Sequence, residues 1–452
     1  MFAKVLVANR GAVAARVLRA LYELRIKSVA VYSEADYGAP YLEMASETHA
    51  VGPAPAADSY LNQDRLMEAI RRSGADGVHP GYGFLSENAE FAQRVVDAGV
   101  RFIGPSPKWI DAMGHKTRAR EIAREYGMPL SEGSGVLPVE PEAILAAARK
   151  IGFPVLVKPA GGGGGIGMLP VRNETELLAT VERSRSLASR GFSNAEVYLE
   201  RLIERPRHVE FQVLGDRHGA AVHLYERDCS TQRRNQKVIE EAPAPAIARS
   251  ELDAMADKVA AMVRGMGYDN IGTVEMLYGA EGSFSFLEMN TRLQVEHGVT
   301  EAVTGVDLVH AQIRSADGER LADILPDKIL LSGHAIQARI YAEDPKNFFP
   351  SPGRLKVFRL PEDETIRVET GYAEGRDVTP FYDPMIAKVI VHDTTRERAI
   401  DRLSEALKAV DIQGLKHNVP AVLAVLDSSA FREGEVHTGI IPQVMAQKRA
   451  AA

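Results

Sequence analysis

Apolar positions in the first part of the chain form short continuous runs separated by a segment with helical spacing. Residues 3–8 and 28–32 are apolar runs of strand length, and residues 12–24 place apolar side chains every three or four positions. This order predicts a βαβ unit with a right-handed crossover and a parallel sheet. The turn Asn9–Gly11 lacks the GxGxxG fingerprint, which argues against a nicotinamide-binding Rossmann fold.

Alternating strands and helices are expected to continue to about residue 104. The loop 79–85, His-Pro-Gly-Tyr-Gly-Phe-Leu, reads better as a structural turn than as a substrate-facing loop. A helix is predicted over 115–127, because Gly127 and Pro129 supply a stop signal. Residues 131–203 have a strand and helix pattern of their own and contain a glycine run, so we expect a compact, mobile lid.

Glycine-containing turns predict two hairpins in the middle of the chain. One turns at 215–219, and the other turns at 279–282 and joins strands within 272–290. Pairing across the second turn brings Glu275 close to Glu288. Two facing carboxylates repel each other unless cations lie between them.

The last unit is expected to start near residue 333. Residues 334–342 alternate as a strand, and Thr394 with Glu397 resembles a capping box. The apolar face of the helix that follows comprises Ala399, Leu403, Ala406, Leu407 and Val410. No long linker separates the units, so we expect them to pack together.

Length and composition narrow the class of protein. A chain of 452 residues predicts about two to four domains. The net charge of −7 argues against nucleic acid or an anionic membrane as the main partner. Cys229 is the only cysteine, which excludes an intrachain disulfide and fits a reducing cytoplasm. No apolar stretch reaches the roughly 20 residues of a membrane helix, and the N-terminal apolar run reads as a buried strand, not a signal peptide.

A glycine run follows one of the apolar strands. Lys158 ends the strand, and Gly161–Gly165 come directly after it. Consecutive glycines let backbone N–H groups converge on phosphate oxygens, and the lysine adds positive charge. The run does not end in Gly-Lys-Ser/Thr, so it is not a Walker loop. A flexible surface loop is the alternative, and the buried strand before it argues against that reading.

The stretch 226–237 is densely polar and, taken alone, reads as a solvated face. Cys229 within it reads as buried filler, because no partner marks it as a nucleophile. Lys237 is a candidate anion-binding residue only if it lies beside Arg292, since two cations can hold one small anion.

The segment 286–297, FLEMNTRLQVEH, carries the richest chemistry. Glu288 and Asn290 alternate as strand neighbours, and with Glu275 they form an oxygen set suited to Mg²⁺ or Mn²⁺. Polar residues on a sheet edge are the alternative reading. Glu296 offers a base beside Arg292.

Two histidines are weighed as metal ligands. His208 and Glu210 alternate on a strand, and zinc is conceivable there, but a polar sheet face is preferred because no third His or Cys has metal-site spacing. His297 reads as a hydrogen-bonded structural residue.

In these motifs the chain resembles biotin carboxylase, the ATP-grasp component of biotin-dependent carboxylases. The resemblance runs from about Phe2 to Thr438. It is carried by VANRG at 7–11, HPGYGFLSEN at 79–88, GGGGGIGM at 161–168, ERDCSTQRRNQKVIEEAPAP at 226–245, EMNTRLQVEH at 288–297, ARIYAEDP at 338–345 and YDPMIAK at 382–388.

The resemblance implies a multidomain α/β and α+β fold. The expected parts are a Rossmann-like N-terminal domain at 1–113, an ATP-grasp domain at 114–332 with its lid at about 131–203, and a mixed α+β C-terminal domain at 333–446.

The resemblance also implies ATP-dependent carboxylation of biotin by bicarbonate through carboxyphosphate, with Mg²⁺ or Mn²⁺. Carried over by motif, the catalytic residues are Glu296 as the bicarbonate base, Lys237 and Arg292 as the anion clamp, and Arg339, which stabilises the biotin enolate. Metal ligands are Glu275, Glu288 and Asn290. Nucleotide, bicarbonate and biotin contacts are Lys116, Lys158, Gly162, Gly163, Gly164, Gly165, Glu200, Leu202, His208, Gln232, Gln294, Val295 and Tyr82.

The implied partners are a second copy of the chain, a separate biotin carrier protein and carboxyltransferase subunits. No biotin-attachment motif is present in the sequence, so we expect a free-standing cytoplasmic subunit or a piece of a longer protein. An acetyl-CoA or other acyl-CoA carboxylase, as in fatty acid biosynthesis, is the main reading.

Five positions depart from the bacterial acetyl-CoA carboxylase pattern: Ala12, His115, Ile166, Asn235 and Gly298. Three of them, Ile166, Asn235 and Gly298, match the urea carboxylase branch, so the carboxylase component of a urea or other non-acetyl-CoA system is an alternative. An ATP-grasp ligase that joins a carboxylate to an amine is disfavoured by the intact 288–297 motif and Arg339. A non-catalytic subunit is disfavoured because Lys237, Arg292 and Glu296 are all present.

Overall fold

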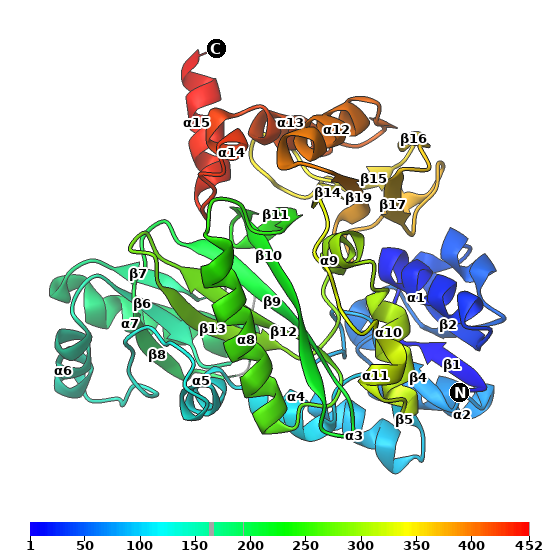
Figure 1. The fold of residues 1–452 in the computed structure, drawn as a ribbon, viewed down its shortest axis with the longest axis horizontal. Coiled ribbons are helices and arrows are strands. Elements are labelled where there is room, and N and C mark those ends of the chain that lie inside the picture. The colour runs from blue at the N-terminus through cyan, green and yellow to red at the C-terminus, as the bar shows by residue number, and fades with distance from the viewer. Residues whose placement is uncertain (162–166, 193, 452) are drawn as a thin grey trace.

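The structure is a computed structural model that describes residues 1–161, 167–192 and 194–451. Figure 1 shows an N-terminal unit in blue, a central sheet in green, a teal unit at the far end of that sheet, and a C-terminal unit in orange and red above it. None of the helices described is both long enough and apolar enough to cross a bilayer.

The N-terminal unit is a five-stranded sheet in the order β3-β2-β1-β4-β5, and every strand pairs parallel to its neighbour. The expected βαβ unit is confirmed, because one helix joins two adjacent parallel strands whose apolar side chains are buried. The elements are β1 (Lys4–Val7), α1 (Gly11–Glu23), β2 (Lys27–Ser33), β3 (Glu47–Gly52), α2 (Gln63–Ser73), β4 (Gly77–His79), α3 (Ala89–Asp97) and β5 (Arg101–Phe102).

Two helices lead from the N-terminal unit into the segment expected to be a lid. They are α4 (Pro107–Gly114) and α5 (Lys116–Glu125). The segment has a three-stranded antiparallel sheet, β7-β6-β8, and an apolar core of its own. Its elements are α6 (Pro141–Ile151), β6 (Val155–Pro159), β7 (Leu169–Val171), α7 (Leu177–Phe192) and β8 (Val197–Arg201).

The largest sheet has eight antiparallel strands in the order β13-β12-β9-β10-β11-β14-β19-β17. It is continuous across the boundary expected near residue 333, because β11 pairs with β14. The central strands and helices are β9 (Arg207–Gly215), β10 (Ala221–Arg233), β11 (Gln236–Ala242), α8 (Arg249–Met266), β12 (Ile271–Tyr278), β13 (Phe284–Asn290), α9 (His297–Thr304), α10 (Leu308–Asp317) and α11 (Leu321–Ile324).

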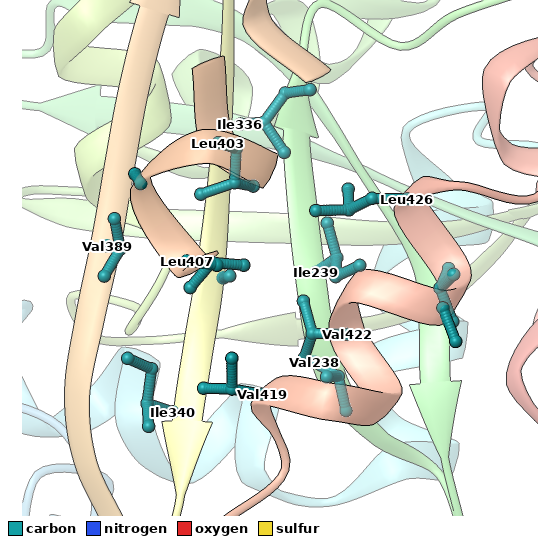
Figure 2. Packing of buried hydrophobic residues seen from close by; sticks show 14 of the residues in the cluster. Val238, Ile239, Ile336, Ile340, Val389, Leu403, Leu407, Val419, Val422 and Leu426 are labelled. Carbon is teal, nitrogen blue, oxygen red and sulfur yellow. The ribbon is translucent and has the colours of Figure 1, made fainter. Parts of the chain in front are cut away.

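The C-terminal unit extends this sheet and covers it with helices. Figure 2 shows Leu403 and Leu407 of α12 and Val422 and Leu426 of α13 packed over the buried face of the C-terminal strands, which carries Ile336. The elements are β14 (His334–Tyr341), β15 (Gly353–Arg354), β16 (Val357–Arg359), β17 (Ile366–Thr370), β18 (Asp377–Val378), β19 (Met385–Asp393), α12 (Arg396–Lys408), β20 (Asp411–Gln413), α13 (Val419–Leu426), α14 (Ser429–Arg432) and α15 (Ile440–Ala451).

Both predicted hairpins are confirmed. Strands β9 and β10 pair across the turn at 215–219, and β12 pairs with β13 so that Glu275 and Glu288 are direct register partners. The hydrophobic periodicity therefore predicted the local pairing that positions these two carboxylates.

Two local predictions were wrong. The polar stretch 226–237 is not a solvated face: it forms the end of β10 and the start of β11, and its residues from Glu226 to Arg233 are buried. The capping residue of α12 is Thr395, whose side chain accepts a hydrogen bond from the Arg398 backbone N–H, so the expected box at Thr394 is one residue off.

Candidate active site

A cavity of about 570 Å³ lies between the large sheet, which includes β14, and the three-stranded sheet. Most of the residues expected from the sequence line it: Lys116, Lys158, Glu200, Leu202, His208, Gln232, Lys237, Glu275, Glu288, Asn290, Arg292, Gln294, Val295, Glu296 and Arg339. Residues far apart in the sequence therefore share one hollow. Tyr82 does not line it, and the expected Gly162–Gly165 loop lies outside the described residues.

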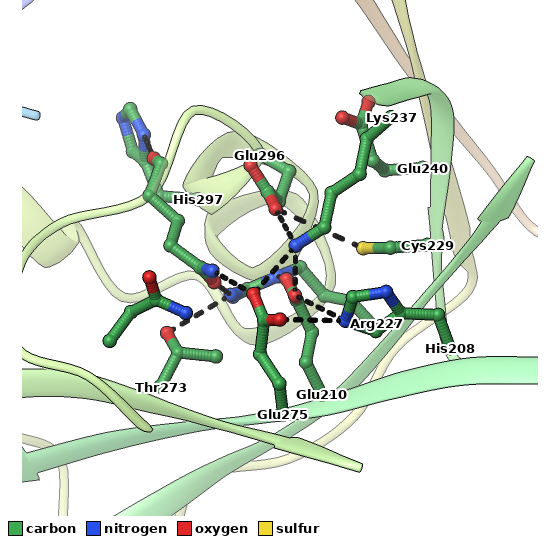
Figure 3. Close-up of polar contacts among 12 residues, drawn as sticks. His208, Glu210, Arg227, Cys229, Lys237, Glu240, Thr273, Glu275, Glu296 and His297 are labelled. Atoms are coloured by element: carbon green, nitrogen blue, oxygen red, sulfur yellow. Dashed lines mark hydrogen bonds and ion pairs between the residues drawn. The ribbon is translucent and has the colours of Figure 1, made fainter. Parts of the chain in front are cut away.

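Lys237, at the start of β11, holds three carboxylates around one ammonium group (Figure 3). Its Nζ lies 2.5 Å from Glu210 Oε2, 3.0 Å from Glu275 Oε1 and 2.7 Å from Glu296 Oε1. Burial lowers the pKa of Lys237, but the three carboxylates raise it further, so the net pKa lies well above the ordinary value. The ammonium therefore stays charged, because three carboxylates surround it.

Arg339 of β14 also contacts Glu296, through the carboxylate oxygen that Lys237 does not contact. Its Nη2 lies 2.9 Å from Glu296 Oε2, and its Nε lies 2.5 Å from Glu240 Oε1. Burial opposes ionisation of Glu296, but Lys237 and Arg339 hold the pKa of that carboxyl well below its ordinary value. Glu296 is thus an ionised acceptor held between two cations.

The cations expected at the nucleotide phosphates are already paired with carboxylates. Lys158 Nζ lies 2.7 Å from Glu200 Oε2, and Arg120 pairs with the other oxygen of that glutamate. Lys116 Nζ lies 3.4 Å from Glu288 Oε2. Both lysines line the cavity, and cations beside a polyphosphate chain screen its charge.

The acidic pair Glu275 and Glu288 offers oxygens on adjacent strands at one level of the sheet. Asn290 lies two residues further along the same strand, and its buried Nδ2 has no protein partner among the described residues. Cations offset the repulsion of the two carboxylates, because Lys237 Nζ lies 3.0 Å from Glu275 Oε1 and Lys116 Nζ lies 3.4 Å from Glu288 Oε2. Two carboxylates and an amide fit a hard divalent cation such as Mg²⁺.

Arg292 also lines the cavity, but its side chain contacts different residues from those that Lys237 contacts. Its Nε lies 2.8 Å from Glu87 Oε2, and its Nη2 donates to Asn290 Oδ1 at 2.7 Å. The clamp of Arg292 with Lys237 stays a prediction: both residues line the cavity, but they pair with different carboxylates among the described residues.

Arg227 is a central residue of the site that sequence reasoning missed. It is fully buried on β10, and its guanidinium donates to Glu210 Oε1 at 2.6 Å and to Gln294 Oε1 at 2.6 Å. Glu210 in turn contacts Lys237, so Arg227 supports the cluster from below (Figure 3). Glu240, the partner of Arg339, was missed as well. The signal that pointed to Arg227 was the unusual density of charges in 226–237, which the reading as a solvated face discarded.

The readings of Cys229 and His297 as structural residues are confirmed. Cys229 is fully buried, and burial raises the pKa of its thiol well above the ordinary value, so it is not a thiolate nucleophile. His297 Nδ1 lies 2.8 Å from the Gln294 carbonyl oxygen, and burial lowers the pKa of His297 to about 4. It is a neutral ring at physiological pH.

The loop 79–85 is a turn, as expected. The Asn9 side-chain amide donates to the carbonyl oxygens of Pro80 and Tyr82, at 2.7 and 2.8 Å. Phe84 has a φ of 43°, a left-handed conformation. Burial raises the pKa of the Tyr82 hydroxyl.

Two of the unusual positions have local structural reasons. Arg234 and Asn235 form the two-residue turn between β10 and β11 with φ of 49° and 62°, a conformation that asparagine favours. At Gly298, an added Cβ would lie 2.5 Å from Ile390 Cδ1. Only the end of the Ile390 side chain, which can shift, lies in that space, so the packing favours a glycine here without requiring one. Ile166 lies outside the described residues.

Three family models match successive parts of the chain. They are "Biotin carboxylase, N-terminal domain" over residues 1–110, "Carbamoyl-phosphate synthase L chain, ATP binding domain" over 115–324, and "Biotin carboxylase C-terminal domain" over 337–443. Together they match most of the chain.

Full-length relatives and a solved structure agree with these matches. The chain is 48% identical over 441 residues to biotin carboxylase of Halalkalibacterium halodurans, covering 98% of this chain and 97% of that protein. It is 47% identical to biotin carboxylase 2 of Bacillus subtilis, covering 98% and 100%. The biotin carboxylase domain dimer of Hydrogenobacter thermophilus 2-oxoglutarate carboxylase, in complex with MgADP, ADP and bicarbonate, superimposes with a TM-score of 0.95 at 42% identity, covering 98% and 99%.

Proposed function

The chain belongs to the biotin carboxylase family, and on that premise we propose how its cavity works and which assembly it serves. It is an ATP-grasp ligase that uses ATP and bicarbonate to carboxylate biotin held on a carrier protein. The observation that carries the proposal is the buried triad of Lys237, Glu296 and Arg339, which shares one cavity with the lysines and the acidic pair.

The reaction has two covalent steps. A bicarbonate oxygen attacks the γ-phosphorus of ATP, ADP leaves, and the product is carboxyphosphate. Its carbon–oxygen bond then breaks to give CO₂ and phosphate, the released phosphate takes the N1 proton of biotin, and the deprotonated N1 attacks CO₂ to form the new nitrogen–carbon bond. The first step joins two anions, so cations must screen their repulsion and align the reacting atoms.

Glu296 is proposed as the base that takes the bicarbonate proton. Lys237 and Arg339 hold the pKa of Glu296 low, after burial has opposed them, so it is ionised and ready to accept a proton at neutral pH. A bicarbonate that enters the cavity replaces the contact of Glu296 with Lys237, because the anion competes with the carboxylate for the same ammonium group. Arg292 and the backbone at Gln294 and Val295 are proposed to hold the other side of the anion.

Arg339 is proposed to stabilise the biotin enolate. A ureido nitrogen is a very weak acid, and a fixed guanidinium beside its oxygen favours the anionic form. Glu240 orients that guanidinium through the 2.5 Å contact to Nε. Tyr82 is proposed to lie by the biotin ring.

The nucleotide is proposed to lie along Lys116, Lys158 and His208, with Glu200 and Leu202 by the adenine. Gln232 donates to the His208 ring at 2.8 Å and sets its orientation. Glu275, Glu288 and Asn290 are proposed to hold Mg²⁺ or Mn²⁺, which when bound neutralises phosphate charge and fixes the in-line geometry. The glycine run is proposed to close over the phosphates.

The assembly and acceptor are proposed at a coarser level. We propose a cytoplasmic homodimer that works with a biotin carrier and carboxyltransferase subunits, with domains at 1–113, 114–332 and 333–446. Acetyl-CoA or another acyl-CoA, as in fatty acid biosynthesis, is the proposed acceptor. The structurally similar domain named above belongs to a 2-oxoglutarate carboxylase, so the carboxylase half alone does not select the acceptor.

Phosphate release from ATP tests the function. The purified chain should release phosphate only when Mg²⁺, bicarbonate and free biotin or a biotinylated carrier are all present. Equal ATP turnover in bicarbonate-depleted buffer would contradict the proposal.

A further inference from the structure

The loop that carries Gln294, Val295 and Glu296 has an anchor in the C-terminal unit that the catalytic assignments leave unused. The Nζ of Lys388 donates to the carbonyl oxygen of Val295 at 2.6 Å. That carbonyl belongs to the same peptide group as the Glu296 N–H, so the contact fixes the backbone between these two residues.

Lys388 is buried in a row of charged residues that crosses three strands. It lies on β19, where it is the register partner of Arg339 on β14 and of Glu369 on β17. Figure 1 shows β14, β19 and β17 side by side, with α9 beneath them. The lysine side chain is only 1% exposed, so its ammonium has no access to bulk water.

Glu369 balances the charge of Lys388. Its Oε2 lies 2.7 Å from Lys388 Nζ, and its Oε1 faces the guanidinium of Arg367. Arg19 of α1 lies 3.5 Å from Oε1 as well. The buried carboxylate thus holds the lysine at one fixed point, with its remaining donors directed at the loop.

A buried lysine at this place is not needed to fill space. A methionine has similar length, and burying an ammonium costs free energy that only a charged partner and a strong acceptor offset. The contact to Val295 is the one contact of Lys388 Nζ, among those the structure gives for the described residues, that reaches the loop of the candidate base.

We propose that Lys388 is a positioning residue for the carboxylation reaction: by holding the Val295 carbonyl it sets the orientation of Glu296 and of the backbone that faces bicarbonate. This inference rests on the proposed function. Lys388 touches no substrate in it and acts only through the loop, while Glu369 holds Lys388 in place.

The test is Lys388→Met, assayed for bicarbonate-dependent phosphate release per folded molecule. A misplacement of about 1 Å in a catalytic group lowers rates on the order of 100-fold, so we expect kcat to fall by about that factor and KM for bicarbonate to rise, with KM for ATP unchanged. Glu369→Gln keeps the donor to Val295 and should lose less activity than Lys388→Met.

Arg396→Met is the matched control. Arg396 forms a buried ion pair with Glu241, 2.7 Å apart, between α12 and β11, and has no contact with the loop 291–296 among the described contacts. It should lower stability but leave kcat unchanged. If Lys388→Met does not fold, Lys388→Met/Glu369→Gln removes both charges of the pair and takes its place.

The outcomes separate the two levels of the proposal. Wild-type kcat in Lys388→Met or in the double variant, or an equal loss of kcat in Arg396→Met, would overturn the positioning role. A loss in Glu369→Gln as large as that in Lys388→Met would overturn it as well. Absence of bicarbonate-dependent turnover in the wild-type chain would instead overturn the proposed function.

Discussion

Replacing Arg227 by methionine tests whether the active-site cluster is held by a buried ion network. Arg227 is fully buried, and its guanidinium donates five hydrogen bonds to other side chains. The acceptors are Glu210 at 2.6 Å, Gln212 at 2.7 Å, Thr300 at 2.9 Å, Thr273 at 3.3 Å and Gln294 at 2.6 Å. Methionine fills much of the volume and removes every donor.

The expected loss of stability follows from the buried partner left behind. Removing one member of a buried ion pair costs about 3–5 kcal/mol. Glu210 keeps its 2.5 Å contact with Lys237 after the change, so we expect the lower end, about 3 kcal/mol. Such a loss is a large part of the roughly 5–15 kcal/mol that stabilises a typical domain.

Urea unfolding followed by tryptophan fluorescence measures this loss. Trp109 is the only tryptophan, and it packs against the apolar core of the central sheet, with its ring 6.4 Å from that of Tyr268. Its signal therefore reports on the unit that contains Arg227. The urea midpoint should fall with no change in the slope of the transition.

A double-mutant cycle with Glu210→Gln supplies the control. The double variant Glu210→Gln/Arg227→Met leaves no buried carboxylate without its arginine, so its cost should be smaller than the sum of the single costs. A loss below about 1 kcal/mol for Arg227→Met would refute the reasoning. Additivity of the two changes within about 0.5 kcal/mol would refute it too.

Two further predictions concern biotin and pH. Arg339→Met should reduce carboxylation of biotin more than bicarbonate-dependent ATP cleavage, measured side by side; equal losses would show that Arg339 acts on the first step. Burial lowers the pKa of His297 from 6.5 to about 4. Between these pH values the imidazole takes up a proton in the unfolded chain but not in the folded chain, so stability is lost as the pH falls from about 6.5 towards 4. The loss for this group is about 3 kcal/mol. His297→Gln should flatten that part of the pH–stability curve obtained from urea midpoints, and an unchanged curve would count against a neutral buried ring.

Local sequence patterns predicted the elements because they depend on neighbours along the chain. The pairing of Glu275 with Glu288 follows from one short hairpin, whose turn sets the register of both strands. The helical spacing of residues 12–24 and the apolar runs beside it led in the same way to α1 between β1 and β2. No long-range information was needed in these cases.

The long-range contacts that hold the active-site side chains in place could not be predicted from local sequence patterns. Arg227 meets Gln294 across 67 residues, and Arg339 meets Glu240 across 99. These contacts depend on the order of strands in the large sheet, where β9 lies between β12 and β10 and β11 pairs with β14. Hydrophobic periodicity carries no information on that order. The charges in 226–237 looked solvated because buried partners such as Gln294 for Arg227 and Glu343 for Arg233 lie far away in the sequence.

The resemblance to a family supplied what periodicity lacked. It named Lys237, Arg292 and Glu296 as one site, and the cavity contains all three. It also flagged Gly298 as a departure that left the acceptor open. The structure shows that an added Cβ at this glycine would lie 2.5 Å from Ile390 Cδ1, and the acceptor is still a proposal.

Bicarbonate labelled with ¹⁸O tests the central claim most directly. If a bicarbonate oxygen attacks the γ-phosphorus, that oxygen stays with phosphorus when carboxyphosphate breaks down. The account predicts that phosphate released from unlabelled ATP in the presence of biotin carries one ¹⁸O atom, and that Glu296→Gln abolishes this labelled product. Phosphate released at the wild-type rate without ¹⁸O would mean that water attacks ATP, and it would contradict carboxyphosphate formation in this cavity.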